Sequence, residues 1–104
     1  MWAQLIKTRL KPGVDEGLLS ELYEQLRATE QPDTGLLRST AMRDEKDPSQ
    51  IYMLVVFESE EKARAREADQ RRQEGLQAVR ATMADIFEGA PEFVDLTVVE
   101  ETSY

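Results

Sequence analysis

The hydrophobic pattern of the chain is densest in residues 50–58, with the sequence QIYMLVVFE. This unbroken apolar run follows Pro48 and is rich in β-branched and aromatic side chains. Such a run is too short for a typical helix and is characteristic of a strand that is buried on both faces. It therefore predicts the central strand of a sheet.

Three other segments carry strand patterns. Residues 2–10 predict a strand, in which successive side chains point to opposite faces. The even-numbered side chains would share one face and the odd-numbered ones the other. Residues 36–43 are more polar and suit an edge strand, and residues 93–99 form the last strand before a tail that we expect to be loose. The acidic segment 44–49 predicts a hairpin turn, because it lacks the alternating ligands and the glycine of a calcium-binding loop.

Two segments carry apolar residues at helical spacing. The first follows the turn at Pro12-Gly13 and can be capped by Asp15, and its stripe consists of Leu18, Leu19, Leu22 and Leu26. The second can be capped by Ser59, and it has only alanines as apolar residues before Gly75. After Gly75 a full stripe follows, made of Leu76, Val79, Met83, Ile86 and Phe87. We expect a break or bend near Gly75, with one long helix as the alternative.

The element order β-α-β-β-α-β predicts an α+β, ferredoxin-like split arrangement. This is an antiparallel sheet with both helices on one face and the first and third strands at its centre. A length of 104 residues predicts a single domain that spans residues 1–104. Because the central strand is apolar in both parities, the helix-free face needs a cover, and stacking on a second copy would give a symmetric homodimer.

The composition narrows the range of chemistry. A net charge of −8 repels phosphate backbones, and Arg71-Arg72 is a pair and not a basic patch, so no nucleic-acid partner is expected. The chain has no Cys and no His, which excludes a thiolate nucleophile, Cys-ligated metal and a Ser-His-Asp triad. No transmembrane segment or signal peptide is evident, so we expect no membrane association and a cytosolic location.

Several short motifs resemble one family. They are Lys11-Pro12-Gly13 after the first strand, Asp47-Pro48 before the central strand, and FESEE at residues 57–61 before an alanine-containing helix. Together they resemble the antibiotic biosynthesis monooxygenase domain, a member of the dimeric α+β barrel superfamily, over nearly the whole chain. Phe57 stands where the family usually has an aromatic residue. The resemblance implies a homodimer whose sheets form a shared barrel, and a pocket between sheet and helices.

The family includes cofactor-independent oxygenases of polycyclic phenols and quinols as well as haem-degrading enzymes. The haem-degrading branch relies on Asn, Trp and His at positions that fall near Ile6, Arg66 or Glu67, and Leu76 of this chain. None of these three residues is retained, which argues against haem degradation. The resemblance therefore implies binding, and oxidation without a cofactor or metal, of an aromatic or quinone-like molecule.

The alternative is a non-catalytic dimeric small-molecule-binding or accessory domain, with a vestigial pocket that is plugged by Trp2, Met83 and Phe87. Under either interpretation the candidate substrate-binding side chains are Gln4, Thr8, Tyr23, Tyr52, Arg66 and Met83. The polar ones could contact a ligand oxygen, the tyrosines could orient or deprotonate a phenol, and Arg66 could meet an anionic substrate. Each also has an ordinary structural interpretation: bonds to neighbouring side chains, core or interface packing, or, for Arg66, a solvated helix face.

Overall fold

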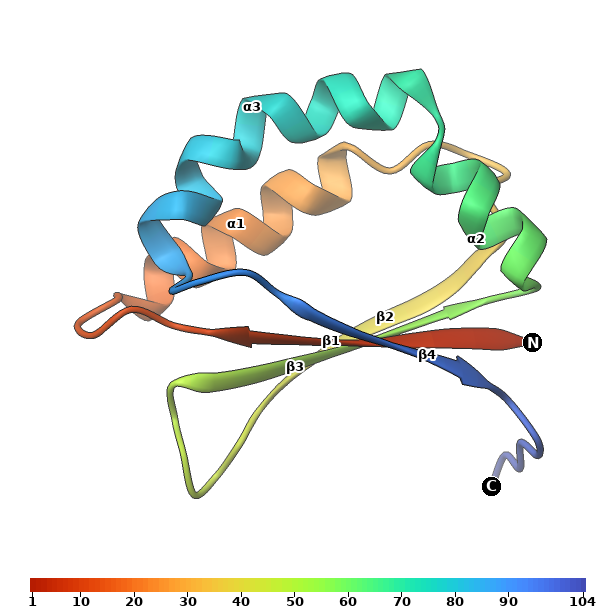
Figure 1. Cartoon of the computed structure of the whole chain (residues 1–104), viewed down its shortest axis with the longest axis horizontal. Helices are drawn as coiled ribbons and strands as arrows, with labels where there is room; N and C mark the ends of the chain where they lie inside the picture. The colour runs from red at the N-terminus through yellow and green to blue at the C-terminus, as the bar shows by residue number, and fades with distance from the viewer.

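A computed structural model describes residues 1–104 as a four-stranded antiparallel sheet with three helices over one face (Figure 1). In chain order the elements are β1 (Trp2–Arg9), α1 (Glu16–Ala28), β2 (Leu36–Arg43), β3 (Gln50–Phe57), α2 (Glu60–Glu67), α3 (Gln70–Ile86) and β4 (Glu92–Thr97). The strand order β2-β3-β1-β4 confirms the ferredoxin-like arrangement, with β1 and β3 central and β2 at an edge. None of the helices has the length and apolar character needed to span a bilayer.

Both predicted helix caps are present. The Asp15 carboxylate accepts a hydrogen bond from the Gly17 N–H at 2.8 Å, and the Ser59 hydroxyl accepts one from the Lys62 N–H at 3.2 Å. Each cap satisfies a backbone donor of the first turn that has no partner within its own helix. The starts of α1 and α2 are therefore fixed by local sequence.

The predicted break near Gly75 is wrong in position. The helical region divides at Ala68 and Asp69, where the Asp69 carboxylate caps α3 by accepting a hydrogen bond from the Arg71 N–H at 2.9 Å. Gly75 lies inside α3, and a Cβ atom there would come within 3.0 Å of the Thr29 side chain. Glycine at this position thus permits close packing of α3 on the end of α1 and does not interrupt the helix.

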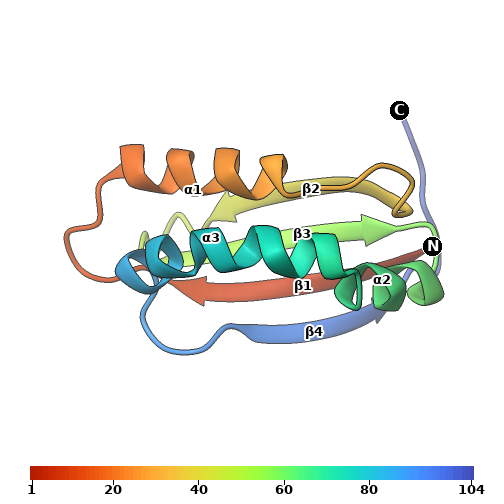
Figure 2. The same cartoon turned by 90° about the horizontal axis from the view of Figure 1, so that it is seen from above.

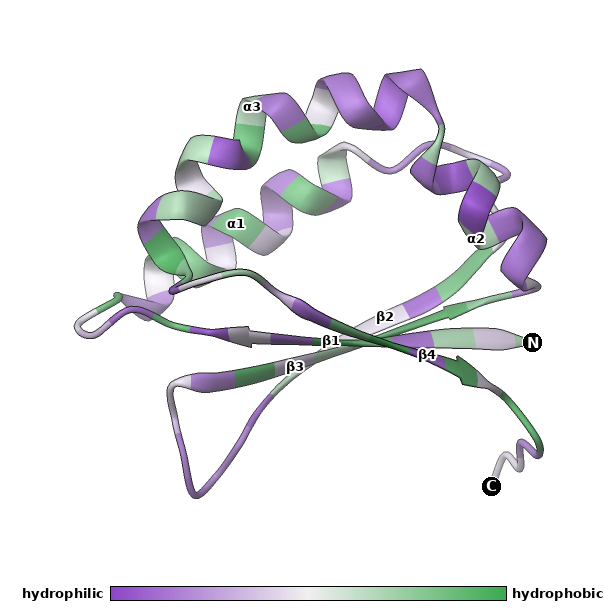
Figure 3. Ribbon diagram, viewed as in Figure 1, coloured by the Kyte–Doolittle hydropathy of each residue, from purple (hydrophilic) through white to green (hydrophobic).

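The two helices of this region have different surroundings. Figure 3 shows α2 as predominantly hydrophilic and the C-terminal half of α3 as largely hydrophobic. Seen from above, α1 runs along the β2 side of the sheet, α3 lies over its centre, and α2 sits near the start of β1 (Figure 2).

Two separate apolar clusters join helices to sheet at opposite ends of the β1–β3 pair. Cluster A consists of the buried residues Leu10, Leu22, Ile51, Val79 and Ile86. Cluster B consists of the buried residues Trp2, Val55, Phe57 and Ala63. The expected leucine stripe of α1 is correct for Leu19, Leu22 and Leu26, which pack in or against cluster A, but Leu18 is 43% exposed.

The sheet register assigns the strand faces. Ile6 of β1 is paired with Met53 of β3 and Phe93 of β4, and residues paired directly across antiparallel strands share a face. Ile51, Met53, Val55 and Phe57 therefore face the helices, whereas their neighbours in β3 point to the helix-free face. The unbroken apolar run of β3 therefore places apolar side chains on both faces of the sheet.

The two leucines of α1 provide a matched stability test. Leu22→Ala should lower the free energy of unfolding by about 2–5 kcal/mol, because Leu22 is fully buried in cluster A. Leu18→Ala should cost less than about 1 kcal/mol because Leu18 lies at the surface. Urea denaturation at one fixed protein concentration measures both, and similar losses in the two variants would contradict the assignment of faces to α1.

Candidate functional site

A cavity of about 970 Å³ lies between the two apolar clusters, over the middle of the sheet. Its floor consists of side chains on the helix-facing side of the sheet, namely Ile6, Thr8, Ala41, Met53, Val55 and Phe93. Its apolar roof consists of Leu26, Leu76 and Met83, and Phe87, which is bridged to Leu10 after the end of β1, borders it at the level of the sheet. The cavity exists because α1 and α3 pack against each other above the sheet while α2 covers only the end near cluster B (Figures 1 and 2).

Four of the six candidate side chains border this cavity: Thr8, Tyr23, Arg66 and Met83. The other two do not. Gln4 shares the helix-facing side of β1, but its Nε2 atom donates to Asp95 Oδ1 at 2.9 Å. Asp95 also accepts from Arg64 Nη2 at 2.9 Å, so Gln4 belongs to a polar network between β1, β4 and α2.

Tyr52 lies on the helix-free face, where it is paired with Lys7 of β1 and Met42 of β2. Its expected position in the pocket is therefore wrong. Both parities of β3 are apolar, so the strand itself carried no signal for which parity faces the helices. The register with β1 decides this.

Arg66 makes an ion pair with Glu30, which lies two residues beyond the C-terminal end of α1. The Arg66 Nε atom donates to Glu30 Oε1 at 3.0 Å, and Nη2 donates to Oε2 at 2.6 Å. The side chains are 15% and 24% exposed, and the guanidinium lies 5.4 Å from the centre of the Phe57 ring. The interpretation of Arg66 as a solvated arginine is therefore wrong: it joins α2 to the end of α1.

The environment of Glu30 has opposing effects on its pKa. Burial raises the pKa, but the hydrogen bond and positive charge of Arg66, with a further hydrogen bond from Thr34, lower it to a net value below the usual range. Glu30 is therefore a carboxylate at neutral pH.

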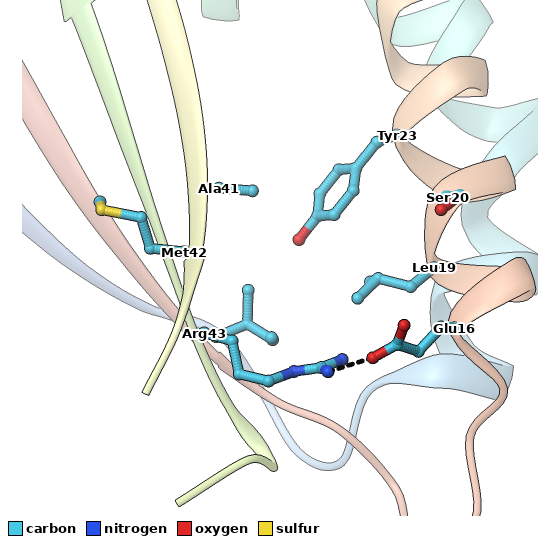
Figure 4. Close-up of a pocket in the computed structure, with 8 residues that line it drawn as sticks. Glu16, Leu19, Ser20, Tyr23, Ala41, Met42 and Arg43 are labelled. Carbon is cyan, nitrogen blue, oxygen red and sulfur yellow. Dashed lines mark hydrogen bonds and ion pairs between the residues drawn. The ribbon is translucent and has the colours of Figure 1, made fainter. Parts of the chain in front are cut away.

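Tyr23 borders both the cavity and a smaller groove of about 300 Å³ between α1 and β2. Figure 4 shows its hydroxyl pointing from α1 into the gap toward β2, above the ion pair of Arg43 with Glu16. Burial raises the pKa of Tyr23, and the charge of Arg43 opposes this only in part. The hydroxyl is therefore protonated at neutral pH and can donate a hydrogen bond to a ligand oxygen.

Arg72 is, with Arg27 and Glu30, one of the charged cavity residues that the sequence interpretation missed. It precedes Leu76 by one helical turn and so continues the apolar stripe of α3 backwards, which is the signal that could have identified it. The side chain is partly buried, and it donates no hydrogen bond to any protein group, with Nε fully enclosed. Burial and the neighbouring charge of Arg66 lower the pKa of its guanidinium, and Glu30 and Glu67 oppose this.

The site is thus an apolar chamber with a few polar side chains at its edges, an arrangement typical of small-molecule sites. One end carries Arg66, Glu30 and Arg72, and the β2 side carries the Tyr23 hydroxyl. No three acidic side chains come together in a metal-binding arrangement.

Comparison with known proteins gives a family for this chain. The family model for antibiotic biosynthesis monooxygenase matches residues 1–77. No curated protein sequence matches at a significant level.

Solved structures share the fold over nearly their full length. A candidate antibiotic biosynthesis monooxygenase of Nitrosomonas europaea has a TM-score of 0.72 at 14% identity, covering 96% of this chain and 100% of its own. A candidate monooxygenase of Chloroflexus aurantiacus has a TM-score of 0.65 at 24% identity, covering 99% and 98%. SnoaB of Streptomyces nogalater, described as a cofactor-independent oxygenase, has a TM-score of 0.70 at 17% identity, covering 96% and 94%.

The ion pair of Arg66 with Glu30 predicts a pH dependence of stability. The pKa of Glu30 is lower in the folded chain, so its contribution is complete above the unfolded value of about 4.3 and is lost as pH falls through the folded pKa. Glu30→Gln should therefore destabilise the chain by roughly 1–3 kcal/mol at pH 7, and by progressively less below about pH 5.

Urea denaturation of wild type and variant at a series of pH values measures this difference. Glu24→Gln, which changes an exposed glutamate of α1 that has no ion pair, is the matched control and should have little effect. A difference between wild type and Glu30→Gln that stays constant down to pH 3 would contradict the assignment.

Proposed function

The chain belongs to the antibiotic biosynthesis monooxygenase family, and on this premise we propose that it binds an aromatic or quinol-type molecule in the central cavity and oxidises it without a cofactor. The observation that carries the proposal is the cavity itself. Its volume of about 970 Å³ is at the upper end of the range of roughly 300–1,000 Å³ for small-molecule sites. Its apolar floor and roof suit a flat, fused-ring molecule.

The alternative of a plugged pocket has little support. Met83 in the roof and Phe87 beside the sheet both border the chamber and leave it open. Trp2 packs in cluster B beside Phe57, with ring centres 6.0 Å apart. The three residues expected to fill the pocket therefore contribute to its walls or lie outside it.

This oxidation needs no redox-active group from the protein, because an anthrone or quinol anion can itself reduce molecular oxygen. In the anthrone case, one oxygen atom forms the new carbonyl at the reacting methylene carbon, and the other leaves as water with the two methylene hydrogens. The apolar walls would hold the ring system, and the Tyr23 hydroxyl would donate a hydrogen bond to the substrate oxygen.

One observation favours a second candidate, a binding domain without turnover. The titratable side chains around the cavity are arginines, the Glu30 carboxylate bonded to Arg66, and Tyr23, whose pKa is raised. None of them is prepared to accept a proton at neutral pH. Catalysis would therefore depend on a substrate acidic enough to ionise in the site.

Oxygen uptake with anthrone as substrate separates the two candidates. We expect uptake above the uncatalysed rate with the wild-type protein, and a fall of roughly tenfold or more in Ala41→Trp, which places an indole on the cavity floor. Ala78→Trp, on the exposed surface of α3, is the matched control and should behave as wild type.

Saturable anthrone binding without uptake would support the binding domain instead. The cavity proposal is wrong if anthrone neither binds nor reacts, or if Ala41→Trp and Ala78→Trp are indistinguishable.

We propose further that the chain is a homodimer that stacks its helix-free faces, as its resemblance to the family implies. The chain exposes 7072 Å² of surface, roughly 1,100 Å² more than a monomeric protein of 11.9 kDa. A stable interface buries about 800 Å² on each partner. The helix-free face carries suitable side chains, among them Leu5, Tyr52, Leu54, Val94 and Leu96.

The C-terminal tail limits how far this face can be covered. The Val98 N–H donates to the Met1 carbonyl at 3.4 Å, and Glu101 pairs with Arg38 of β2 at 3.1 Å. The tail thus passes from the β4 edge to the β2 edge on the side away from the helices (Figures 1 and 2). A partner would bind beside the tail or displace it.

Sedimentation velocity over a range of concentrations tests the dimer. The wild-type chain should sediment at twice 11.9 kDa. Leu96→Asp should shift it toward the monomer, because the symmetric interface would enclose two unpaired carboxylates. Leu18→Asp, at an exposed position on α1, should leave the mass unchanged. A wild-type monomer at all concentrations would exclude the dimer.

A cytosolic location and the lack of a nucleic-acid partner, both inferred from composition, stay predictions.

A further inference from the structure

Arg72 is unpaired at the one end of the cavity where charges gather. Its neighbour Arg66 is neutralised by Glu30, and both Glu30 oxygens are already bonded to Arg66, with Thr34 donating to one of them at 3.0 Å. Glu67, the other carboxylate near Arg72, is paired with Arg64 at 3.1 Å. No protein group accepts a hydrogen bond from the Arg72 Nε atom.

The charge around the cavity is opposite in sign to that of the chain. The residues that border the cavity include three arginines, Arg27, Arg66 and Arg72, and a single acidic residue, Glu30. This is an excess of two positive charges in a chain whose net charge is −8. A positive cavity inside an acidic protein attracts an anionic ligand over a cationic one.

The neighbours of Arg72 on α3 determine which part of a ligand would lie next to an anionic group bound at Arg72. Leu76 and Met83 lie on the same side of the helix and form part of the cavity roof, and Met83 follows Arg72 by roughly 16 Å of helix. A molecule with its charged group at Arg72 would therefore have its body against these apolar side chains. Arginine suits a planar oxyanion, because its guanidinium can donate two parallel hydrogen bonds.

We infer that the cavity takes an apolar, ring-containing molecule that carries a carboxylate, and that Arg72 binds this carboxylate. This rests on the proposed function in one respect, that the cavity binds a small molecule. It goes further in predicting that an anionic group on the ligand strengthens binding, and in naming the residue that recognises it.

The test uses a neutral fluorescent reporter and two competitors that differ only in charge. N-phenyl-1-naphthylamine reports occupancy of the apolar chamber, and 2-naphthoate and 2-naphthamide are then titrated against it. We expect 2-naphthoate to displace the reporter from the wild-type protein at a concentration roughly tenfold or more below that of 2-naphthamide.

Arg72→Gln should abolish this preference, so that 2-naphthoate and 2-naphthamide displace the reporter at similar concentrations. Arg71→Gln removes the same charge from the adjacent residue, which is 61% exposed and paired with Asp69, and should retain the preference. Arg72→Lys keeps the charge without the planar fork and should give an intermediate preference. Circular dichroism and thermal unfolding establish that each variant is folded.

The outcomes separate this inference from the function on which it rests. Reporter binding that Ala41→Trp prevents would support the cavity. In that case the carboxylate site is wrong if 2-naphthoate and 2-naphthamide compete equally, or if the preference for 2-naphthoate persists in Arg72→Gln. If the reporter does not bind, or binds equally to Ala41→Trp, the cavity proposal fails and the carboxylate site fails with it.

Discussion

The helices are fixed to the sheet through two apolar clusters at opposite ends of the β1–β3 pair, and the middle of the sheet is left between them. In cluster A, Leu22 of α1 and Val79 and Ile86 of α3 pack on the sheet. In cluster B, Ala63 of α2 packs against Trp2 and Phe57. Because α3 begins only after the cap at Asp69, α2 and α3 can cover different ends of the sheet. The central cavity is a direct consequence of this division.

Charge pairing gives the cavity its chemical asymmetry. Arg66 and Glu30 join α2 to the end of α1 and neutralise each other, with most of both side chains removed from solvent. A partly buried pair of this kind needs all its hydrogen bonds to offset the cost of desolvation, and Thr34 supplies an additional one to Glu30. The same arrangement leaves Arg72 without an acceptor, so that one end of an otherwise apolar chamber is positive.

These properties suit a protein whose composition offers few reactive side chains. The chain has neither Cys nor His, and Tyr23 is held in its protonated form by burial. What such a site can supply is shape, an apolar surface, a hydrogen-bond donor and a positive charge. The fold is shared with proteins of 14–24% identity, which is a likeness of architecture and leaves the chemistry to the side chains described above.

Local sequence determined the elements of this protein, and tertiary packing determined its site. The apolar run of β3, the caps Asp15 and Ser59 and the element order were enough for the ferredoxin-like fold and for strand boundaries within two residues, because each depends on neighbours in the chain. Gly75 could not be interpreted locally, since its reason is the distant Thr29. The side of the sheet on which Tyr52 lies could not be predicted locally either. The side chains of β3 are apolar on both faces, and only the register of β3 with β1 assigns the faces. The pairing of Arg66 and Arg72 likewise depends on Glu30, a residue distant in the sequence, whose carboxylate accepts hydrogen bonds from Arg66 and none from Arg72.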